Sequence, residues 1–525
     1  MNAPSPADCF SQSYADARAA FLRACADARA EITSYRHPLS APDGAPLFLD
    51  VARVGAPDAR RVLFLASGTH GVEGFCGSGI QTFLLCDGLL DRLPAGVALV
   101  IVHAVNPWGF AWLRRVNEDS VDINRNFLNH RAPYPQNPDY DRLDDALNPE
   151  RLDDAAVAAL REVVRRFEQE HGWEAVYRSL AGGQYRHPRG LQYGGRAPVW
   201  SNRALRAVWA RHADGAELAA CVDLHSGLGP CGIGLLLQTA PEASTAARLA
   251  HAWWPDVIRS EPAQGSDAAL ASGLMGPAFV AAHPHAAAVG LVLEFGTRDM
   301  NEVMLAMHAD NWLHHYGARD SETGRAIARR MQDAFYIQDD VWKEQACQRA
   351  REVVDRAFAG MAAFVPEPAS GDATRVRPAR PDDLDILVAF ERAMARETES
   401  LELDSDTLRT GVAELLADPT RGRVFLVECN GDLVATLTLT LEWSDWRNGF
   451  FWWIQSVYVS PAQRRRGHYR RLHEHVRTLA ARDPSVCGLR LYVEHENHAA
   501  QETYHALGMH ETYYRLFEQP IQSEM

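Results

Sequence analysis

The chain has 525 residues, 47% of them hydrophobic and 23% charged, and its formal net charge is -15. This composition is typical of a folded enzyme rather than a disordered chain, and the length suits roughly two to four domains. The acidic balance disfavours a nucleic-acid-binding protein, which needs a dense basic surface.

The N-terminal segment MNAPSPADCF lacks the basic region and apolar stretch of a secretory signal. No later segment approaches the ~20 consecutive apolar residues of a membrane span. The 9 cysteines are scattered without CxxC spacing, which favours reduced thiols. We therefore expect a cytoplasmic protein with no membrane partner.

Four apolar segments in the first part of the chain predict buried strands: RVLFLASG, VALVIVHAVNP, AACVDLHSG and GLVLEFGT. They alternate with helical stretches, which predicts an α/β domain with a mostly parallel sheet. Polar residues stand where these strands end: His70 and Glu73, then Asn106, His225 and Glu294. Because parallel strands end at one rim of a sheet, we expect these side chains to converge.

Two of these residues are imidazoles, and together with one carboxylate they suit a catalytic zinc ion. His70, Glu73 and His225 would leave a tetrahedral ion with an open position for water. A bound zinc lowers the pKa of its water towards ~7, and Glu294 is placed to accept the proton. Taken alone, an HxxE pair is common by chance, and a histidine at a strand end is more often structural.

A longer set of motifs favours the zinc interpretation. NPWGFAWLRRVNEDSVDINRNF, from Asn106 to Phe127, follows the HxxE pair and precedes the distant histidine and the late glutamate. From roughly Phe10 to Met361 the sequence resembles the zinc carboxypeptidase family. It is most similar to a poorly characterised bacterial branch, which also has GQYRHPRGLQYGG and PVWSN.

This resemblance implies a role for each matched residue. It implies zinc ligands at His70, Glu73 and His225, a general base and proton shuttle at Glu294, and an arginine at Arg115 that polarises the scissile carbonyl. Asn124 and Arg125 match the pair that binds a substrate carboxylate. Trp108 departs from the aspartate of many relatives, and the family's substrate tyrosine has no clear counterpart. Tyr185 and Tyr193 lie in a glycine-rich loop that suits either a lid or a simple turn, and Arg114 is interpreted as solvated or structural.

A proline- and glycine-rich stretch, AFVPEPASGDATRVRPARPDD, separates two modules. It follows a closing helix, QDDVWKEQACQRAREVVDRAFAGMAAF, and precedes a short strand and a helix from Pro381. We predict a first domain at 1–362, a linker at 363–373 and a second domain at 374–525.

The second module contains a separate motif, a basic turn at the start of a predicted helix. The predicted strand WWIQSVYVS leads into PAQRRRGHYRRLHEHVRTLAARD, a basic turn that opens a helix. Such a turn presents N–H groups and the positive helix end to a pyrophosphate, although a solvated basic helix cap would look the same. A strand, a turn with Asn497 and a helix with Tyr504 follow.

From about Thr374 to Gln519 the sequence resembles the GNAT superfamily of acetyl-CoA-dependent N-acetyltransferases. The resemblance implies that Val457 and Val459 pair with pantetheine, that Asn497 lies near the cofactor, and that Tyr504 protonates the leaving thiolate. The residues implied to hold the pyrophosphate are Arg464, Arg465, Arg466, Gly467, His468, Tyr469 and Arg470. Tyr469 departs from the usual small residue, and Glu494 and Glu496 are candidates for a general base. The aromatic residues Trp443, Trp446, Phe450, Phe451, Trp452 and Trp453 either line an acceptor pocket or form sheet core.

The sequence as a whole predicts an α/β protein of two domains: a zinc-carboxypeptidase-like α/β/α mixed sheet followed by a GNAT-like α+β domain. The predicted function is bifunctional: zinc-dependent hydrolysis of a peptide or small-molecule amide, and acetyl-CoA-dependent acetylation of an amine. In the alternative, only one domain is catalytic and the other binds substrate or acts as a scaffold. An interaction protein is disfavoured because it leaves both motif sets unexplained. The oligomeric state stays open.

Overall fold

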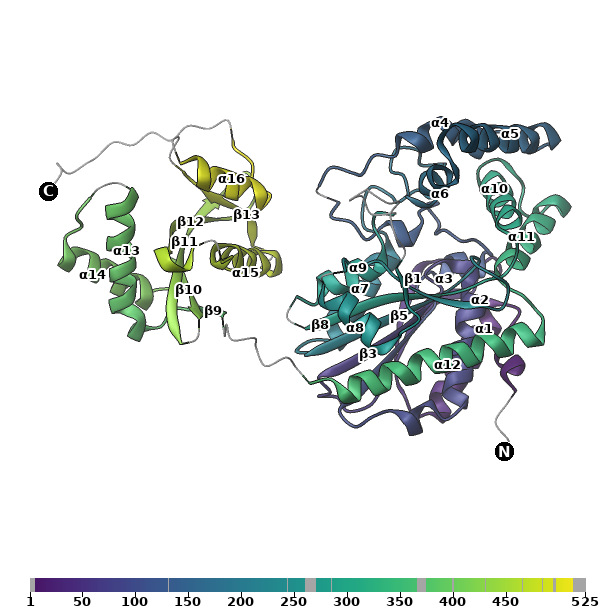
Figure 1. Cartoon of the computed structure of the whole chain (residues 1–525), viewed down its shortest axis with the longest axis horizontal. Coiled ribbons are helices and arrows are strands. Elements are labelled where there is room, and N and C mark those ends of the chain that lie inside the picture. The colour runs from purple at the N-terminus through teal and green to yellow at the C-terminus, as the bar shows by residue number, and fades with distance from the viewer. Residues whose placement is uncertain are drawn as a thin grey trace. The chain divides into compact units, whose positions relative to one another are not determined.

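The computed structural model describes residues 5–130, 132–242, 244–259, 271–284, 286–365, 374–398, 401–429, 431–464, 466–483, 485–493 and 497–512. Its contacts divide the chain into two compact units, Met1–Val365 and Pro366–Met525 (Figure 1). The linker was predicted at 363–373, and most of that stretch lies outside the described residues. In the described part of the chain, no helix combines the length and apolar character needed to cross a membrane.

The first unit is built on a mixed sheet with the strand order β1-β2-β4-β3-β5-β8-β6-β7. Its strands are β1 Glu31–Ser40, β2 Pro46–Val54, β3 Arg61–Ser67, β4 Val97–His103, β5 Leu218–Ser226, β6 Gly234–Gln238, β7 Ile258–Arg259 and β8 Ala287–Phe295. The four predicted strands are β3, β4, β5 and β8, which lie side by side and parallel at the centre. Their carboxyl ends therefore meet at one rim.

Helices cover both faces of this sheet and extend beyond its rim. They are α1 Tyr14–Asp27, α2 Gly74–Cys86, α3 Pro107–Ala111, α4 Pro138–Leu147, α5 Asp154–His171, α6 Trp173–Ala181, α7 Trp200–His212, α8 Thr245–Trp253, α9 Met275–Ala282, α10 Met300–Tyr316, α11 Glu322–Phe335 and α12 Asp340–Ala363. Short 3-10 turns are η1 Pro6–Cys9, η2 Gly71–Glu73, η3 Leu89–Arg92 and η4 Ile123–Arg125. The predicted closing helix is α12, which runs along one face of the sheet (Figure 1).

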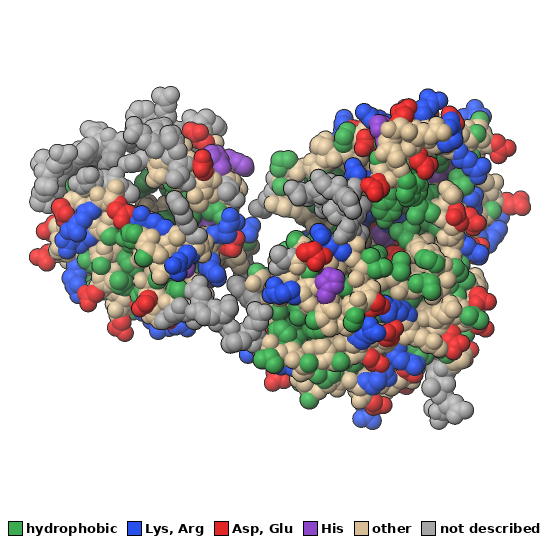
Figure 2. All heavy atoms as spheres, in the orientation of Figure 1, with side chains coloured by type: hydrophobic (Ala, Val, Ile, Leu, Met, Phe, Trp, Pro, Cys, Tyr) green, Lys and Arg blue, Asp and Glu red, His purple; other side chains and the backbone are tan. Residues whose placement is uncertain are grey.

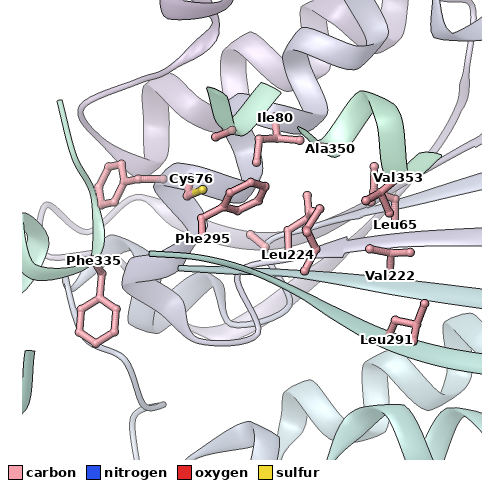
Figure 3. Packing of buried hydrophobic residues seen from close by; sticks show 14 of the residues in the cluster. Leu65, Cys76, Ile80, Val222, Leu224, Leu291, Phe295, Phe335, Ala350 and Val353 are labelled. Carbon is pink, nitrogen blue, oxygen red and sulfur yellow. The ribbon is translucent and has the colours of Figure 1, made fainter. Parts of the chain in front are cut away.

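The central strands are apolar on both sides because each side is covered. Alternate residues of β3 enter different cores: Leu63 and Leu65 pack in one, and Val62 and Phe64 in the other. Figure 3 shows the first core, where strand residues pack against α2 and α12. Two-sided burial explains why these strands read as continuous apolar runs. It also fixes the register that places polar side chains at the rim.

The second unit is an α+β fold around a five-stranded sheet with the order β13-β12-β11-β10-β9. Its elements are β9 Arg375–Pro378, η5 Pro381–Asp383, α13 Leu384–Thr398, α14 Ser405–Ala417, β10 Arg423–Cys429, β11 Asp432–Ser444, β12 Gly449–Val459, η6 Pro461–Gln463, α15 His468–Arg482, β13 Val486–Leu491 and α16 His498–Ala506. One face of the sheet packs on α15, and α13 and α14 cover part of the other. The helix predicted from Pro381 begins with η5 and continues as α13.

Candidate functional site

Three predicted ligand residues meet beyond the carboxyl ends of β3 and β5. The Nδ1 atoms of His70 and His225 each lie 2.9 Å from a different carboxylate oxygen of Glu73, and the two Nδ1 atoms lie 3.1 Å apart. Ligands bound about 2.0–2.1 Å from a tetrahedral zinc are themselves about 3.3 Å apart. The three side chains therefore need only a small outward adjustment to hold one ion. Within the described residues, this is the one group of three His, Cys, Asp or Glu side chains spaced for a metal.

The loop that carries His70 and Glu73 is held by the segment that carries Arg115. The Gly71 and Val72 amides donate to the backbone carbonyls of Arg115 and Arg114, at 3.0 and 2.9 Å. A Cβ on Gly71 would lie 2.2 Å from the Gly109 carbonyl carbon, so only glycine allows this contact. The HxxE loop and the Asn-Pro-x-Gly turn thus form one structural unit, which explains why both motifs occur together.

Two buried carboxylates that the sequence analysis did not assign orient the histidines. The Nε2 atom of His70 lies 3.0 Å from Asp122 Oδ1, and that of His225 lies 2.6 Å from Asp223 Oδ2. A carboxylate on Nε2 keeps its proton there and leaves Nδ1 free for a metal. Asp223 lies two residues before His225 on the same strand face, and this D-x-H spacing was the available sequence signal.

The ionisation of the side chains around His70, Glu73 and His225 is shifted by their burial and by their neighbours. Burial alone would raise the pKa of Glu73, but His70 and His225 outweigh it and hold that pKa below its usual range. Burial likewise opposes ionisation of Asp122, yet Arg115 and His70 keep its pKa well below normal. The pKa of His225 is raised, because Asp223 and Glu73 outweigh its burial. Glu73 and Asp122 are thus held ionised in a buried region, where Glu73 can pair with a bound cation.

Glu294 lies beside the ligands, on the neighbouring strand. It is the register partner of His225 across β5 and β8, and its Oε1 accepts a hydrogen bond from the Leu228 amide at 3.0 Å. Burial, reinforced by the charge of Glu73, raises the pKa of Glu294 to about 7. A carboxyl group with such a pKa exchanges a proton near neutral pH, as a general base and acid requires.

Arg115, in the segment that follows α3, also lies beside Glu73. Its Nη1 donates to Asp122 Oδ2 at 2.5 Å and to Gln192 Oε1 at 3.3 Å, and its Nε lies 3.5 Å from Glu73 Oε1. Its Nη2 has no hydrogen-bond partner in the described part of the chain. Arg114 instead points away and pairs with buried Asp310 at 2.9 Å, in the structural role expected for it.

Arg125 is a buried cation that has no anion in contact among the described residues. Its Nε and Nη2 donate to the Ala181 carbonyl and its Nη1 to the Asn124 carbonyl, and no described carboxylate pairs with it. Burial lowers the pKa of Arg125, because the buried position disfavours its charged form. Of its five N–H groups, one on each terminal nitrogen stays open to a ligand. The Asn124 side chain accepts from the Met275 amide, which leaves its NH₂ group to donate.

The glycine-rich loop forms a fixed wall of this site. The Tyr185 hydroxyl donates to the Arg125 carbonyl at 2.8 Å, and the Asp122 amide donates to the Tyr193 carbonyl at 2.7 Å. Both tyrosine side chains are buried. The loop is therefore bonded to the segment that carries Asp122 and Arg125, and a lid is not needed to explain its composition.

The structure also points to an unassigned tyrosine. Tyr177 lies on α6 one turn before Ala181, so it is on the helix face that contacts Arg125. Burial raises the pKa of Tyr177, and Arg125 and Glu294 both act on it electrostatically. The charges of Arg125 and Glu294 thus both reach the Tyr177 phenol. The sequence held no motif around Tyr177 that marked it.

In the second unit, β12 and β13 separate where the cofactor was predicted. They pair in parallel only as far as Ile454 and Leu491, while β12 continues to Val459. The register of β12 against β11 also shifts beside Gln455. Val457 and Val459 therefore pair with β11 on one side, and their other side has no described strand partner.

The predicted pyrophosphate turn precedes α15. Gly467 is the N-cap residue with φ 80, and Arg466 and Arg470 are exposed. The His468 side chain is buried, so only its backbone N–H faces the helix end. Arg464 donates through Nε to the Val459 carbonyl and through Nη2 to the Glu397 carboxylate. Arg465 lies outside the described residues, as do Glu494 and Glu496.

Tyr504 and Asn497 lie on α16 beside this turn. The Tyr504 ring packs edge-on against Tyr469, with ring centroids 5.8 Å apart, and burial raises its pKa. The Asn497 side chain caps α16 by accepting from the Ala500 amide. Of the six aromatic residues, Trp452 belongs to the core, whereas Trp443 and Trp446 are exposed.

Comparison with known proteins adds a family for each unit. The family model described as "Protein of unknown function (DUF2817)" matches residues 10–349. The chain belongs to the DUF2817 family. Residues 387–509 match the acetyltransferase (GNAT) family model, so the DUF2817 region is followed by a GNAT acetyltransferase domain. No curated protein matches the chain.

Solved structures similar to parts of this DUF2817 protein include a possible acetyltransferase from Clostridium difficile 630. It is 42% identical, with 28% of this chain and 98% of that chain covered and a TM-score of 0.28. The aminoglycoside N-acetyltransferase AAC(6')-Iy in complex with CoA is 16% identical, with 30% and 100% covered and a TM-score of 0.26. A probable acetyltransferase is 20% identical, with 29% and 99% covered and a TM-score of 0.26.

Proposed function

We propose that the DUF2817 unit is a zinc-dependent hydrolase that cleaves a peptide or amide bond near a substrate carboxylate, as the resemblance to zinc carboxypeptidases implies. The observation that carries this proposal is the His70, Glu73 and His225 group, whose donor atoms are spaced for one ion. The donor set of two imidazoles and one carboxylate suits zinc, and Asp122 and Asp223 lie at Nε2 of the two imidazoles, where a carboxylate favours the tautomer that zinc needs.

When bound, zinc would act as a Lewis acid and supply an activated water. Two side chains of the protein would transfer the proton and stabilise the developing negative charge. Glu294 takes the proton of the attacking water and delivers it to the leaving amine, which its pKa near neutrality permits. Arg115, fixed through Nη1 and Nε, offers its open Nη2 to the oxygen on which negative charge develops.

The substrate is recognised by a carboxylate that Arg125 and Asn124 bind. Arg125 is a buried cation that contacts no carboxylate in the described part of the chain, so a ligand carboxylate would offset the cost of its burial. Tyr177, whose phenol is influenced by the charges of Arg125 and Glu294, is a further candidate for substrate contact. His70, Glu73, His225 and Glu294 are each less than a tenth exposed, which favours a small molecule or a chain end over a folded protein.

The second unit supplies acetyl transfer from acetyl-CoA to an amine. The free side of β12 at Val457 and Val459 would pair with pantetheine, and the N–H groups at the start of α15 would bind the pyrophosphate. Tyr504 would return a proton to the CoA thiolate. In the alternative function, one unit keeps its fold but only binds substrate.

The hydrolase proposal is tested with zinc-loaded full-length protein and paired N-acyl amino acids and N-acyl amino acid amides. We expect about one zinc per chain, lost in His70→Ala and His225→Ala, and hydrolysis of the acids in preference to the amides. Glu294→Gln should keep the metal and lose turnover, and Arg125→Ala should mainly raise KM. Retention of full metal by both histidine variants would refute the ligand assignment.

The acetyltransferase proposal is tested by CoA titration and by thiol release from acetyl-CoA with a panel of amines. Tyr504→Phe should bind CoA normally but release thiol more slowly. Tyr458→Phe is the control, because Tyr458 packs against Phe390 in the α13 core. Normal thiol release by Tyr504→Phe would remove Tyr504 from the mechanism.

A further inference from the structure

Gln192, in the fixed loop, has an unusual backbone conformation. Its φ is 59°, in the left-handed region that favours glycine. The backbone on both sides is pinned: the Leu191 amide donates to Asn148 Oδ1 at 3.1 Å, and the Tyr193 carbonyl accepts from the Asp122 amide at 2.7 Å. The Gln192 carbonyl itself accepts from the Gln184 amide. Non-glycine residues held in this region concentrate at functional sites.

The side chain of Gln192 is directed at Arg115. Its Oε1 accepts from Arg115 Nη1 at 3.3 Å, and the same Nη1 donates to Asp122 Oδ2 at 2.5 Å. Both N–H groups of Nη1 are thereby used. The contact of Arg115 Nε with Glu73 Oε1 is a long ion pair at 3.5 Å, so the guanidinium is held most directly through Nη1. A second acceptor on Nη1 limits its rotation about the bond to Asp122. The open Nη2 of Arg115 is then kept in one direction.

We propose that Gln192 is a positioning residue for Arg115: its left-handed backbone aims the side-chain amide oxygen at Nη1, so that Nη2 faces the oxygen of a bound carbonyl ligand. The proposal rests on the hydrolase function proposed above. A donor that stabilises developing charge must be oriented beforehand, because reorientation during the reaction would cost part of the stabilisation.

A purely conformational role for Gln192 predicts something different. Glycine and asparagine adopt a left-handed φ more readily than glutamine, so either would fit the turn at least as well. Asparagine also keeps the carboxamide but is shorter by one methylene group. Gln192→Asn therefore separates the two roles: it preserves the turn and withdraws the oxygen from Arg115.

The test uses full-length protein and two measurements. Crystal structures of the wild type and of Gln192→Asn show whether the Arg115 guanidinium moves, whatever the enzyme's activity. Titration of cobalt-substituted protein with acetohydroxamate, followed by visible absorption, measures binding of a carbonyl ligand that has no carboxylate for Arg125. We expect a displaced or multiply placed guanidinium, unchanged thermal stability and metal content, and acetohydroxamate affinity lower by about tenfold.

A double-mutant cycle completes the test. In an Arg115→Ala background, Gln192→Asn should change acetohydroxamate affinity less than twofold, because the group that Gln192 positions is gone. An unmoved guanidinium with unchanged affinity in Gln192→Asn would overturn the positioning role, even with an active hydrolase. Failure of the hydrolase proposal would be seen separately. In that case His70→Ala would keep its metal and Glu294→Gln would keep its turnover.

Discussion

At the scale of single residues, the two carboxylates behind the histidines matter as much as the ligands. Asp223 accepts from both His225 and Thr69, so the orientation of its carboxylate is fixed. Asp223→Asn should leave the fold intact and reduce zinc affinity by about 10- to 100-fold, because the amide no longer holds the Nε2 proton. Competition with a chelator measures this affinity.

Asp141→Asn is the matched control for this change. Asp141 Oδ1 lies 2.7 Å from His187 Nε2, so it is an aspartate–histidine pair of the same kind outside the metal-ligand group. The Asp141→Asn variant should leave zinc affinity unchanged. Equal affinity in Asp223→Asn and Asp141→Asn would show that Asp223 does not support the metal ligand.

His103 gives the first unit a pH-dependent stability. It is fully buried at the end of β4, stacks on Phe21 and contacts Ser78 Oγ at 2.8 Å through Nε2. Burial lowers the pKa of His103 to about 4. Between that value and the unfolded pKa of about 6.5, the unfolded chain binds more protons, so stability is full above about pH 6.5 and falls towards pH 4.

The expected loss from this residue is about 3 kcal/mol between pH 7 and pH 4. Hydrogen exchange of the β4 amides across this pH range reports the first unit by itself. His103→Gln should flatten the profile, whereas His171→Gln, at an exposed position on α5, should not. The same slope in wild type and His103→Gln would assign the effect to other groups.

At the scale of elements, the turn after α6 supports the carboxylate-binding arginine. Gly183 has φ 82, and a Cβ there would lie 2.8 Å from Arg125 Cδ. Gly183→Ala should therefore destabilise the protein by more than the roughly 1 kcal/mol of a left-handed alanine, and should weaken binding of N-acetylglycine.

Gly44→Ala is the control for the backbone effect. Gly44 has φ 84 in the turn between β1 and β2, and a Cβ there would meet nothing within 4 Å. Thermal unfolding and N-acetylglycine titration of both variants separate the two effects. If Gly183→Ala lost no more stability than Gly44→Ala and bound N-acetylglycine normally, the turn would not support Arg125.

At the scale of the whole molecule, hydrolysis of an amide releases an amine, and an amine is what a GNAT domain acetylates. We expect the full-length protein, given a cleavable amide and acetyl-CoA, to convert part of the released amine to its acetyl derivative. Glu294→Gln should produce neither product, and Tyr504→Phe should accumulate the free amine. Mass spectrometry follows both. An amine that is released but never acetylated would separate the two activities.

The surface of the first unit carries charges of both signs. On the face shown in Figure 2, acidic and basic side chains are interspersed over the described part of the first unit. Together with the formal net charge of -15, this mixed distribution disfavours a nucleic-acid partner, which needs a dense basic surface.

Sequence alone determined the four central strands at whose ends the His70, Glu73 and His225 group lies. The apolar runs of β3, β4, β5 and β8 predicted buried strands because covering both faces of a sheet requires apolar residues at every position. The order of the motifs indicated His70, Glu73 and His225 as one group, because parallel strands end at one rim. The GNAT pattern was equally local, since a turn, a helix start and a strand lie close together in the chain.

Only the tertiary structure decided how these side chains are used. Asp122 and Gln192 lie 70 residues apart in sequence yet contact the same nitrogen of Arg115. Tyr177 comes from a helix that no motif marked, and His468 turned inward although it stands in a predicted binding turn. Local patterns fix backbone conformation and burial on one element. Which atoms meet across elements depends on how all of the elements pack, and a single sequence does not state that.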